Sequence, residues 1–133
     1  MAHPNIDLVR DLYGAFMAGD AERLRAAFDP DVRLDVSGFD PGAGSYEGID
    51  AVLGYFFAAD HMDDYRLEVV DMLVSDERVA VIAKTSGRRG DSTIVNDYVQ
   101  AIRLTDGKVV EIRNYNWDQR AIAEFMSVAA SAR

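Results

Sequence analysis

The hydrophobic period of this 133-residue sequence changes near Tyr65, and this change limits the folds that the chain can adopt. Before it, apolar side chains recur at helical spacing, apart from "VRLDV" at residues 32–36, whose alternation predicts a strand with one buried face. After it, they alternate with polar side chains, as in strands that bury one face. Helices followed by a run of strands predict an α+β domain, with the helices packed on one face of a curved antiparallel sheet. No repeat or linker divides the sequence, so we expect one domain spanning residues 1–133.

Amphipathic helical segments are expected before the change of period. Tyr13 and Phe16 belong to the apolar face of the first segment, and Asp20, which follows a glycine, is an N-cap signal for the second. A glycine-rich loop, "SGFDPGAGSYEGID", then leads into a third helix with Phe56 on its buried side. This loop is too long for a simple turn, which favours a loop that covers another part of the molecule.

Four strands and a final helix are expected after the change of period. Turn residues separate the strands, so consecutive strands form hairpins. One of these turns contains Arg88 and Arg89, which we interpret as solvated residues at a hairpin tip. The strands are "YRLEVVDMLVSD", "RVAVIAKTS", "TIVNDYVQAIRL" and "KVVEIRNYNW", and the last helix is "DQRAIAEFM".

The charge of the chain argues against two classes of partner. Its formal net charge is −9 and its pI is near 4.5, whereas nucleic acids and anionic membranes are bound by clustered Lys and Arg. The sequence has no cysteine, which excludes disulfides and thiolate chemistry. Its N-terminal segment lacks the long apolar run of a signal peptide or a membrane span, so we expect a cytoplasmic protein.

The register of the last two strands decides which way the asparagines of "RNYNWD" face. A two-residue Asp106–Gly107 loop would pair Leu104 with Val109, and charged side chains would then share the buried face. A three-residue loop with a glycine bulge would pair Leu104 with Lys108 instead. This second register collects the apolar side chains on one face, and we adopt it.

The adopted register places five polar side chains on the apolar face of the sheet. Tyr98 lies opposite Asn114 in it. Asn96 lies opposite Asn116, and Gln100 points to the same side. One interpretation is a small-molecule cavity with an apolar floor and a polar inner wall. The other is a structural amide network, or a sheet end that is open to water.

Three side chains are candidates for catalysis. His61 ends the third helix and has an ordinary pKa near neutrality; its alternative is an exposed helix-end histidine. Asp40 could be delivered to the cavity by the glycine-rich loop, or it is a turn aspartate before proline. Tyr98 could donate to a developing oxyanion, or it is a core tyrosine bonded to Asn114.

The expected substrate contacts are the polar group and several aromatic side chains. Trp117 is expected either to contact the substrate or to pack against the last helix. No histidine and carboxylate spacing indicates a metal site and no glycine loop indicates a phosphate site, so we expect cofactor-free chemistry. The contacts are Asn96, Gln100, Asn114, Asn116, Tyr13, Phe16, Phe56 and Trp117.

The chain as a whole resembles the nuclear transport factor 2-like superfamily, within it the SnoaL-like branch that includes ketosteroid isomerase. The resemblance covers nearly the whole sequence in the family's order. It implies a cone-shaped, curved antiparallel sheet that wraps a pocket closed by the N-terminal helices, as in the cystatin-like α+β barrel, commonly in a homodimer. The resembling segments are "VRDLYGAFMAGDAERLRAAFDPDVRLDV", "YEGIDAVLGYF", "DERVAVIAKTSG" and "LTDGKVVEIRNYNWDQRAI".

The family's catalytic residues do not carry over to this sequence. The general base of ketosteroid isomerase corresponds to Val36, with Asp35 adjacent and pointing outward by alternation. The family's helix tyrosine corresponds to Leu12, one residue before Tyr13, and its buried acid corresponds to about Gln100. The resemblance therefore implies the fold and a pocket without implying the steroid-isomerase mechanism.

Two functions remain open from the sequence. The first is a SnoaL-like enzyme that performs a proton-transfer reaction, such as cyclisation, isomerisation, dehydration or hydrolysis, on a partly apolar, carbonyl-bearing substrate. The second is a non-catalytic ligand-binding or dimerisation domain of the same fold, with association through the outer sheet face. The polar inner group favours the first, and the missing base favours the second.

Overall fold

The computed structural model describes residues 3–57 and 62–131, and the side chains up to residue 126. The first helix ends at Met17 and is followed by Gly19, which has a positive φ. The side chain of Asp20 accepts a hydrogen bond from the Arg23 N–H, which caps the second helix as expected. In chain order, the elements are α1 (Pro4–Met17), α2 (Ala21–Ala27), β1 (Phe28–Val36), β2 (Gly44–Glu47), α3 (Ile49–Phe57), β3 (Asp63–Val74), β4 (Arg78–Arg89), β5 (Ser92–Thr105), β6 (Lys108–Asn116) and α4 (Gln119–Ser131).

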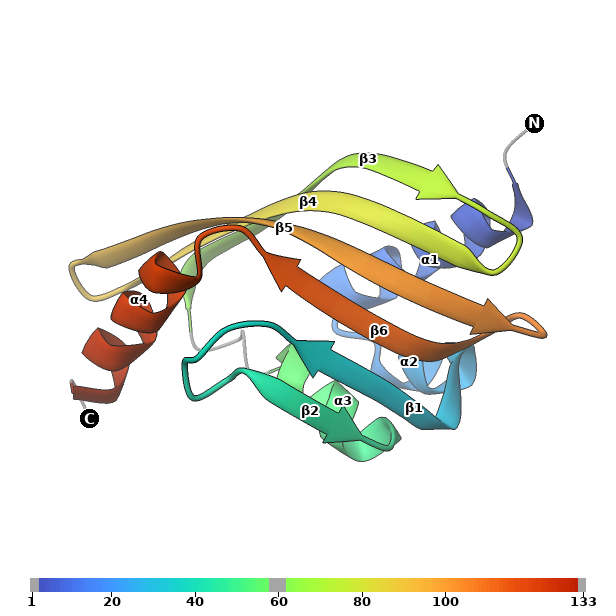
Figure 1. Ribbon diagram of the computed structural model, residues 1–133, viewed down its shortest axis with the longest axis horizontal. Coiled ribbons are helices and arrows are strands. Elements are labelled where there is room, and N and C mark those ends of the chain that lie inside the picture. Colours follow the sequence, from blue (N-terminus) through green and yellow to red (C-terminus); the bar gives the residue numbers. More distant parts are fainter. Residues whose placement is uncertain (1–2, 58–61, 132–133) are drawn as a thin grey trace.

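The strands form one curved, unclosed sheet in the order β2-β1-β6-β5-β4-β3 (Figure 1). Strands β3 to β6 form the expected antiparallel meander. Two features differ from the expectation. β1 pairs with β6 in parallel, and the glycine-rich loop contains the short strand β2, which is antiparallel to β1. A parallel pair joins strands that are distant in the sequence, so no hairpin signal marks it.

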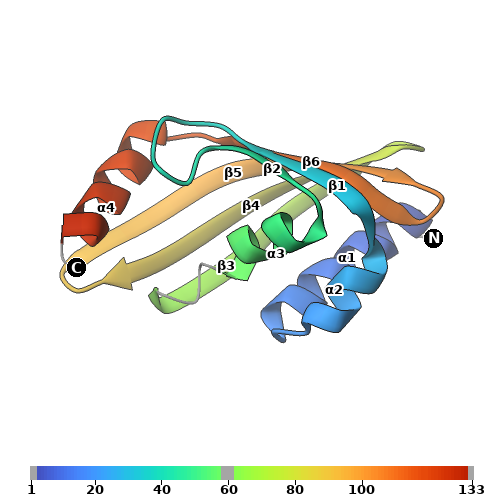
Figure 2. The same ribbon diagram turned by 90° about the horizontal axis from the view of Figure 1, so that it is seen from below.

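The helices cover the concave face of the sheet. Helices α1, α2 and α3 lie beneath the strands, and α4 lies at the end where β4 turns into β5 (Figure 2). The core forms between these layers, where alternate strand residues meet the apolar faces of the helices. Its fully buried side chains include Val9, Val32, Leu34, Val52, Ile102 and Ile112.

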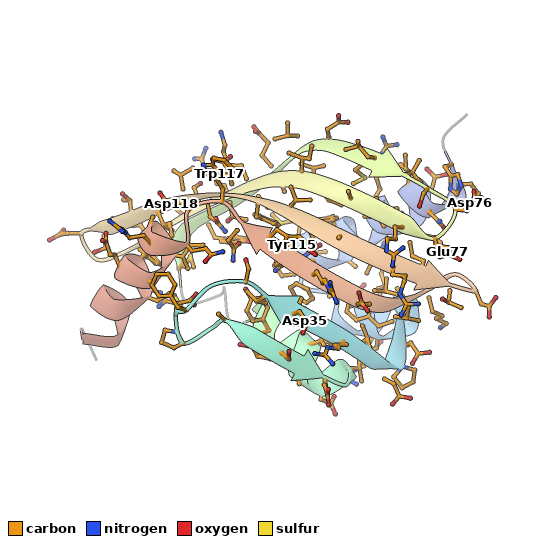
Figure 3. All side chains as sticks on the ribbon, in the orientation of Figure 1. Asp35, Asp76, Glu77, Tyr115, Trp117 and Asp118 are labelled. Carbon is orange, nitrogen blue, oxygen red and sulfur yellow. The ribbon has the colours of Figure 1, made fainter. Side chains whose placement is uncertain are left out.

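The opposite face of the sheet carries charged ladders. Arg103, Glu111 and Arg113 lie together there, with 3.8 Å between Arg103 and Glu111 and 3.5 Å between Glu111 and Arg113. Asp35 also points to this side, where its carboxylate lies 3.1 Å from Arg33 (Figure 3). The hydroxyl of Ser45 and the two arginines around it lower the pKa of Asp35. These placements confirm the predicted outward face.

None of the helices in the described part of the chain is both long and apolar enough to cross a membrane.

Candidate functional site

A cavity of about 490 Å³ lies between the concave face of the sheet and the helices. Its floor is apolar, with contributions such as Leu24, Ile102 and Ile112. All five polar residues that the sequence placed on this face line it, and we call them the polar wall. The polar wall consists of Asn96, Tyr98, Gln100, Asn114 and Asn116.

The register that orients the polar wall differs from the predicted one. Asp106 and Gly107 both have positive φ and form a two-residue turn, so Leu104 pairs with Val109. A bulge then inserts one extra residue, Val110, into β6, and beyond it Gln100 pairs with Asn114. The predicted partner of Leu104 is therefore wrong by one residue, and the predicted partner of Tyr98, beyond the bulge, is wrong by two. Because side chains alternate with a period of two, the predicted face is still correct.

A chain of hydrogen bonds crosses the buried part of the polar wall. The Tyr13 hydroxyl donates to Gln100 Oε1 at 2.6 Å, and Gln100 Nε2 donates to Asn114 Oδ1 at 2.8 Å. Gln100 and Asn114 are only 7% and 8% exposed. Three elements, α1, β5 and β6, thus meet at one point, and the amides are held in fixed orientations.

The remaining asparagines form a second group closer to α4. Asn96 Nδ2 donates to Asn116 Oδ1 at 3.0 Å, and the Asn116 amide donates to the backbone oxygen of Ser37 at 3.3 Å. These bonds use the donor of Asn96 but not its oxygen. Asn96 Oδ1 is buried and has no hydrogen-bond partner among the described residues. A buried acceptor of this kind is suited to a ligand donor.

Five tyrosines line the cavity and remain neutral over the physiological range. Burial raises the pKa of Tyr13, Tyr98 and Tyr65, and neighbouring phenols raise the first two further. Burial, with smaller effects from Tyr46 and Asp40, raises the pKa of Tyr55 to about 12 against an opposing hydrogen bond with Asn114. The cavity therefore presents neutral hydroxyl groups to a ligand.

The glycine-rich loop brings a carboxylate to the cavity. Asp40 lines it, and its Oδ2 accepts from the Gly42 N–H at 2.9 Å. The Tyr46 hydroxyl donates to the Gly42 carbonyl at 2.7 Å, which fixes the loop. Burial and the charge of Asp40 together raise the pKa of Tyr46. The loop therefore covers part of the cavity, in agreement with the prediction that it covers another part of the molecule.

The predicted aromatic contacts divide into two groups. Tyr13, Phe16 and Phe56 line the cavity, and the rings of Phe16 and Phe56 meet edge to face with centroids 6.1 Å apart. Trp117 was expected to contact the substrate or to pack against the last helix. Instead it is 85% exposed and lies with Tyr115 on the outer face (Figure 3). Alternation explains this, because Asn116 beside it points inward. His61 lies outside the described residues.

Two cavity tyrosines were not predicted from the sequence, and one arginine was predicted at the wrong place. Tyr65 lines the cavity and shares a strand face with Leu67, so alternation could have revealed it. Tyr55 immediately precedes Phe56 and Phe57 on α3 and also lines the cavity. Arg89 also lines the cavity, because β4 continues to that residue, whereas Arg88 is exposed as predicted.

The residue that the resemblance matched to the general base of ketosteroid isomerase is Val36. It lines the cavity and is 7% exposed. Among the described residues, no group of three or more histidine and carboxylate side chains is arranged to hold a metal ion.

The SnoaL-like domain model matches residues 9–112. The chain belongs to the SnoaL-like family. Uncharacterized proteins of Mycobacterium tuberculosis and Mycobacterium bovis are 31% identical to this SnoaL-like protein over 127 residues, which cover 91% of this chain and 95% of theirs.

Solved structures show the same fold. Bal32a, from a soil-derived mobile gene cassette, superposes with a TM-score of 0.85 at 25% identity, covering 92% of this chain and 95% of Bal32a. A putative SnoaL-like polyketide cyclase from Jannaschia superposes with a TM-score of 0.78, covering 96% of this chain and 97% of that protein. Its 17% identity makes it a likeness of fold alone.

Proposed function

We propose that this SnoaL-like protein is a cofactor-free acid–base enzyme that acts on a partly apolar, carbonyl-bearing small molecule. The polar wall inside an otherwise apolar cavity is the observation that carries the proposal. Such a composition is typical of small-molecule sites, in which a few fixed polar groups orient the ligand. The cavity of about 490 Å³ is large enough for a molecule of several rings.

The chemistry follows from the two kinds of group at the cavity. Tyr98 is a neutral phenol that stabilises negative charge developing on a carbonyl oxygen, and the amide of Asn114 orients the same group. Asp40 carries the proton, because it is the carboxylate that the described residues contribute to the cavity lining and its loop is fixed by Tyr46. The reaction class is proton transfer next to a carbonyl, as in isomerisation, cyclisation or dehydration.

A carbon-acid exchange assay tests this function without the natural substrate. The protein is incubated in D₂O with 2-tetralone, and loss of the proton next to the carbonyl is followed by NMR. We expect Asp40→Asn to lower the exchange rate about 100-fold or more, because a positioned base contributes at least that much. Asp31→Asn, an exposed aspartate on β1, is the matched control. Equal rates in all three proteins would exclude Asp40 as the base.

A non-catalytic ligand-binding or dimerisation domain is the second candidate. The apolar side chain at Val36, where the family's base stands, favours it. In that case, 2-tetralone or a larger ketone binds the cavity, and the exchange rate equals that of buffer. Native mass spectrometry of protein from its own source then identifies the retained ligand.

We also propose that the protein forms a homodimer through the outer face of the sheet. Large apolar side chains that are at least half exposed support this, and a dimer would cover them. We expect Trp117→Glu with Val95→Glu to halve the sedimenting mass, whereas Phe39→Glu, in the loop before β2, leaves it unchanged. A monomeric wild type would refute the proposal. The side chains are Leu73, Val95, Tyr115 and Trp117.

A further inference from the structure

One buried donor in the cavity has no hydrogen-bond acceptor among the residues that the structure describes. It is Arg89 Nε, and Asn96 Oδ1 is the corresponding unpaired acceptor. Both residues line the cavity. Buried polar atoms are nearly always paired in folded proteins, so a donor and an acceptor left open in the same cavity indicate groups that a ligand satisfies.

Arg89 differs from its neighbour in the same hairpin. Arg88 points to solvent and lies 3.1 Å from the Asp64 carboxylate. Arg89 points inward by alternation, and its guanidinium lies 5.8 Å from the ring centroid of Phe125 on α4. The aromatic ring holds the guanidinium in place but cannot accept its N–H groups as a carboxylate does. The cation is thus positioned and still able to bind an anion.

Among the described residues, no acidic side chain forms an ion pair with Arg89. No carboxylate in the described part of the chain lies within 4.0 Å of the Arg89 nitrogens, although the protein carries many acidic residues. Asp40, the other charged residue of the lining, is bonded to the backbone of its own loop. A partly buried guanidinium in apolar surroundings is stabilised by an anionic oxygen, and its planar fork matches a carboxylate.

We propose that the ligand of this cavity is an organic carboxylic acid and that Arg89 binds its carboxylate at the α4 end. This inference rests on the proposed function as a small-molecule site and names the substrate class. Arg89 pairs with Ser92, and Asn96 lies four residues further along β5, about 13 Å away in an extended strand. The ligand therefore carries an apolar body and, toward Asn96 Oδ1, a hydrogen-bond donor such as a hydroxyl group.

Two matched probes test the substrate class. 6-Hydroxy-2-naphthoate and 6-hydroxy-2-naphthamide have the same shape and differ in charge, and their affinities are measured by isothermal titration calorimetry. We expect the wild type to bind the acid at least about tenfold more tightly than the amide, because hydrogen bonds to charged groups are the stronger ones. Arg89→Gln should remove this preference and keep the affinity for the amide. Arg88→Gln, with the same change in net charge, should retain the preference.

A second measurement works in the wild type alone. The buried Nε–H of Arg89 gives a proton–nitrogen NMR signal, assigned by its absence in Arg89→Lys. The acid should shift this signal, and the amide should leave it in place. This readout holds even if Arg89→Gln does not fold.

The outcomes separate this inference from the proposed function. Equal affinities for acid and amide in the wild type, or a preference that survives in Arg89→Gln, would overturn the carboxylate assignment and leave the small-molecule site standing. No binding of either probe, together with no binding of 2-tetralone, would overturn both.

Discussion

Tyr13, Gln100 and Asn114 link the first helix to the centre of the sheet through two short hydrogen bonds. Each bond is made by a side chain that has lost most of its contact with water, so the alternative to the bond is an unpaired buried group rather than a hydrated one. The polar wall therefore contributes to stability as well as to the site. Any substitution in the polar wall therefore changes both the stability of the fold and the ligand site, and control variants have to separate these two effects.

Removing one hydroxyl measures the structural part of this network. Tyr13→Phe leaves Gln100 Oε1 buried without its donor, and we expect the free energy of unfolding to fall by about 1–3 kcal/mol. Urea denaturation followed by circular dichroism provides the value. Tyr115→Phe removes a hydroxyl from a half-exposed tyrosine on the outer face and should change stability by less than about 0.5 kcal/mol. Similar losses in both variants would contradict the role given to the Tyr13 bond.

At the scale of elements, the hairpin between β5 and β6 sets the orientation of the polar wall. Asp106 and Gly107 have φ of 51° and 75° and form the turn. The bulge that follows the turn brings Ile102 opposite Ile112. The sequence is compatible with a tight turn or with a glycine bulge, and the structure contains both a tight turn and a bulge. The short segment "TDGK" is compatible with a turn and with a bulge. Only the pairing along the whole length of both strands therefore decides whether one or both of them form.

The same substitution at two glycines should have opposite signs. Gly107→Ala places a side chain at φ of 75°, which costs about 1–2 kcal/mol. Gly14→Ala lies within α1, where an added methyl group meets no atom within 4 Å, and should stabilise by about 0.5–1 kcal/mol. Thermal unfolding of both variants beside the wild type gives the comparison. A stabilised Gly107→Ala would show that the turn does not require its left-handed residue.

For the whole molecule, the buried tyrosines predict a loss of stability in alkali. In the unfolded chain tyrosines have pKa values near 10, whereas burial raises the pKa of Tyr13, Tyr55 and Tyr98 in the folded state. Above pH 10 the unfolded state releases protons that the folded state keeps. The contribution of these tyrosines is therefore complete below pH 10 and is lost as the pH rises, for Tyr55 between about 10 and about 12.

Urea denaturation between pH 9 and pH 11.5 measures this loss. Each tyrosine that is protonated only in the folded state should lower the free energy of unfolding by about 1.4 kcal/mol per pH unit above pH 10. Tyr98→Phe should reduce the slope by about that amount. A slope that is identical in wild type and variant would show that Tyr98 titrates alike in the folded and unfolded states.

The sequence by itself determined the α+β layout, the inward face of the strands, the outward charges and the apolar residue at Val36. Each of these depends on local periodicity, which the chain carries in its residue order. The tertiary structure alone decided the parallel pairing of β1 with β6 and the register of the asparagines. It also placed Arg89, which the sequence predicted at an exposed hairpin tip, in the cavity lining beside Phe125. These features depend on contacts between segments far apart in the chain, whose energies no local pattern encodes.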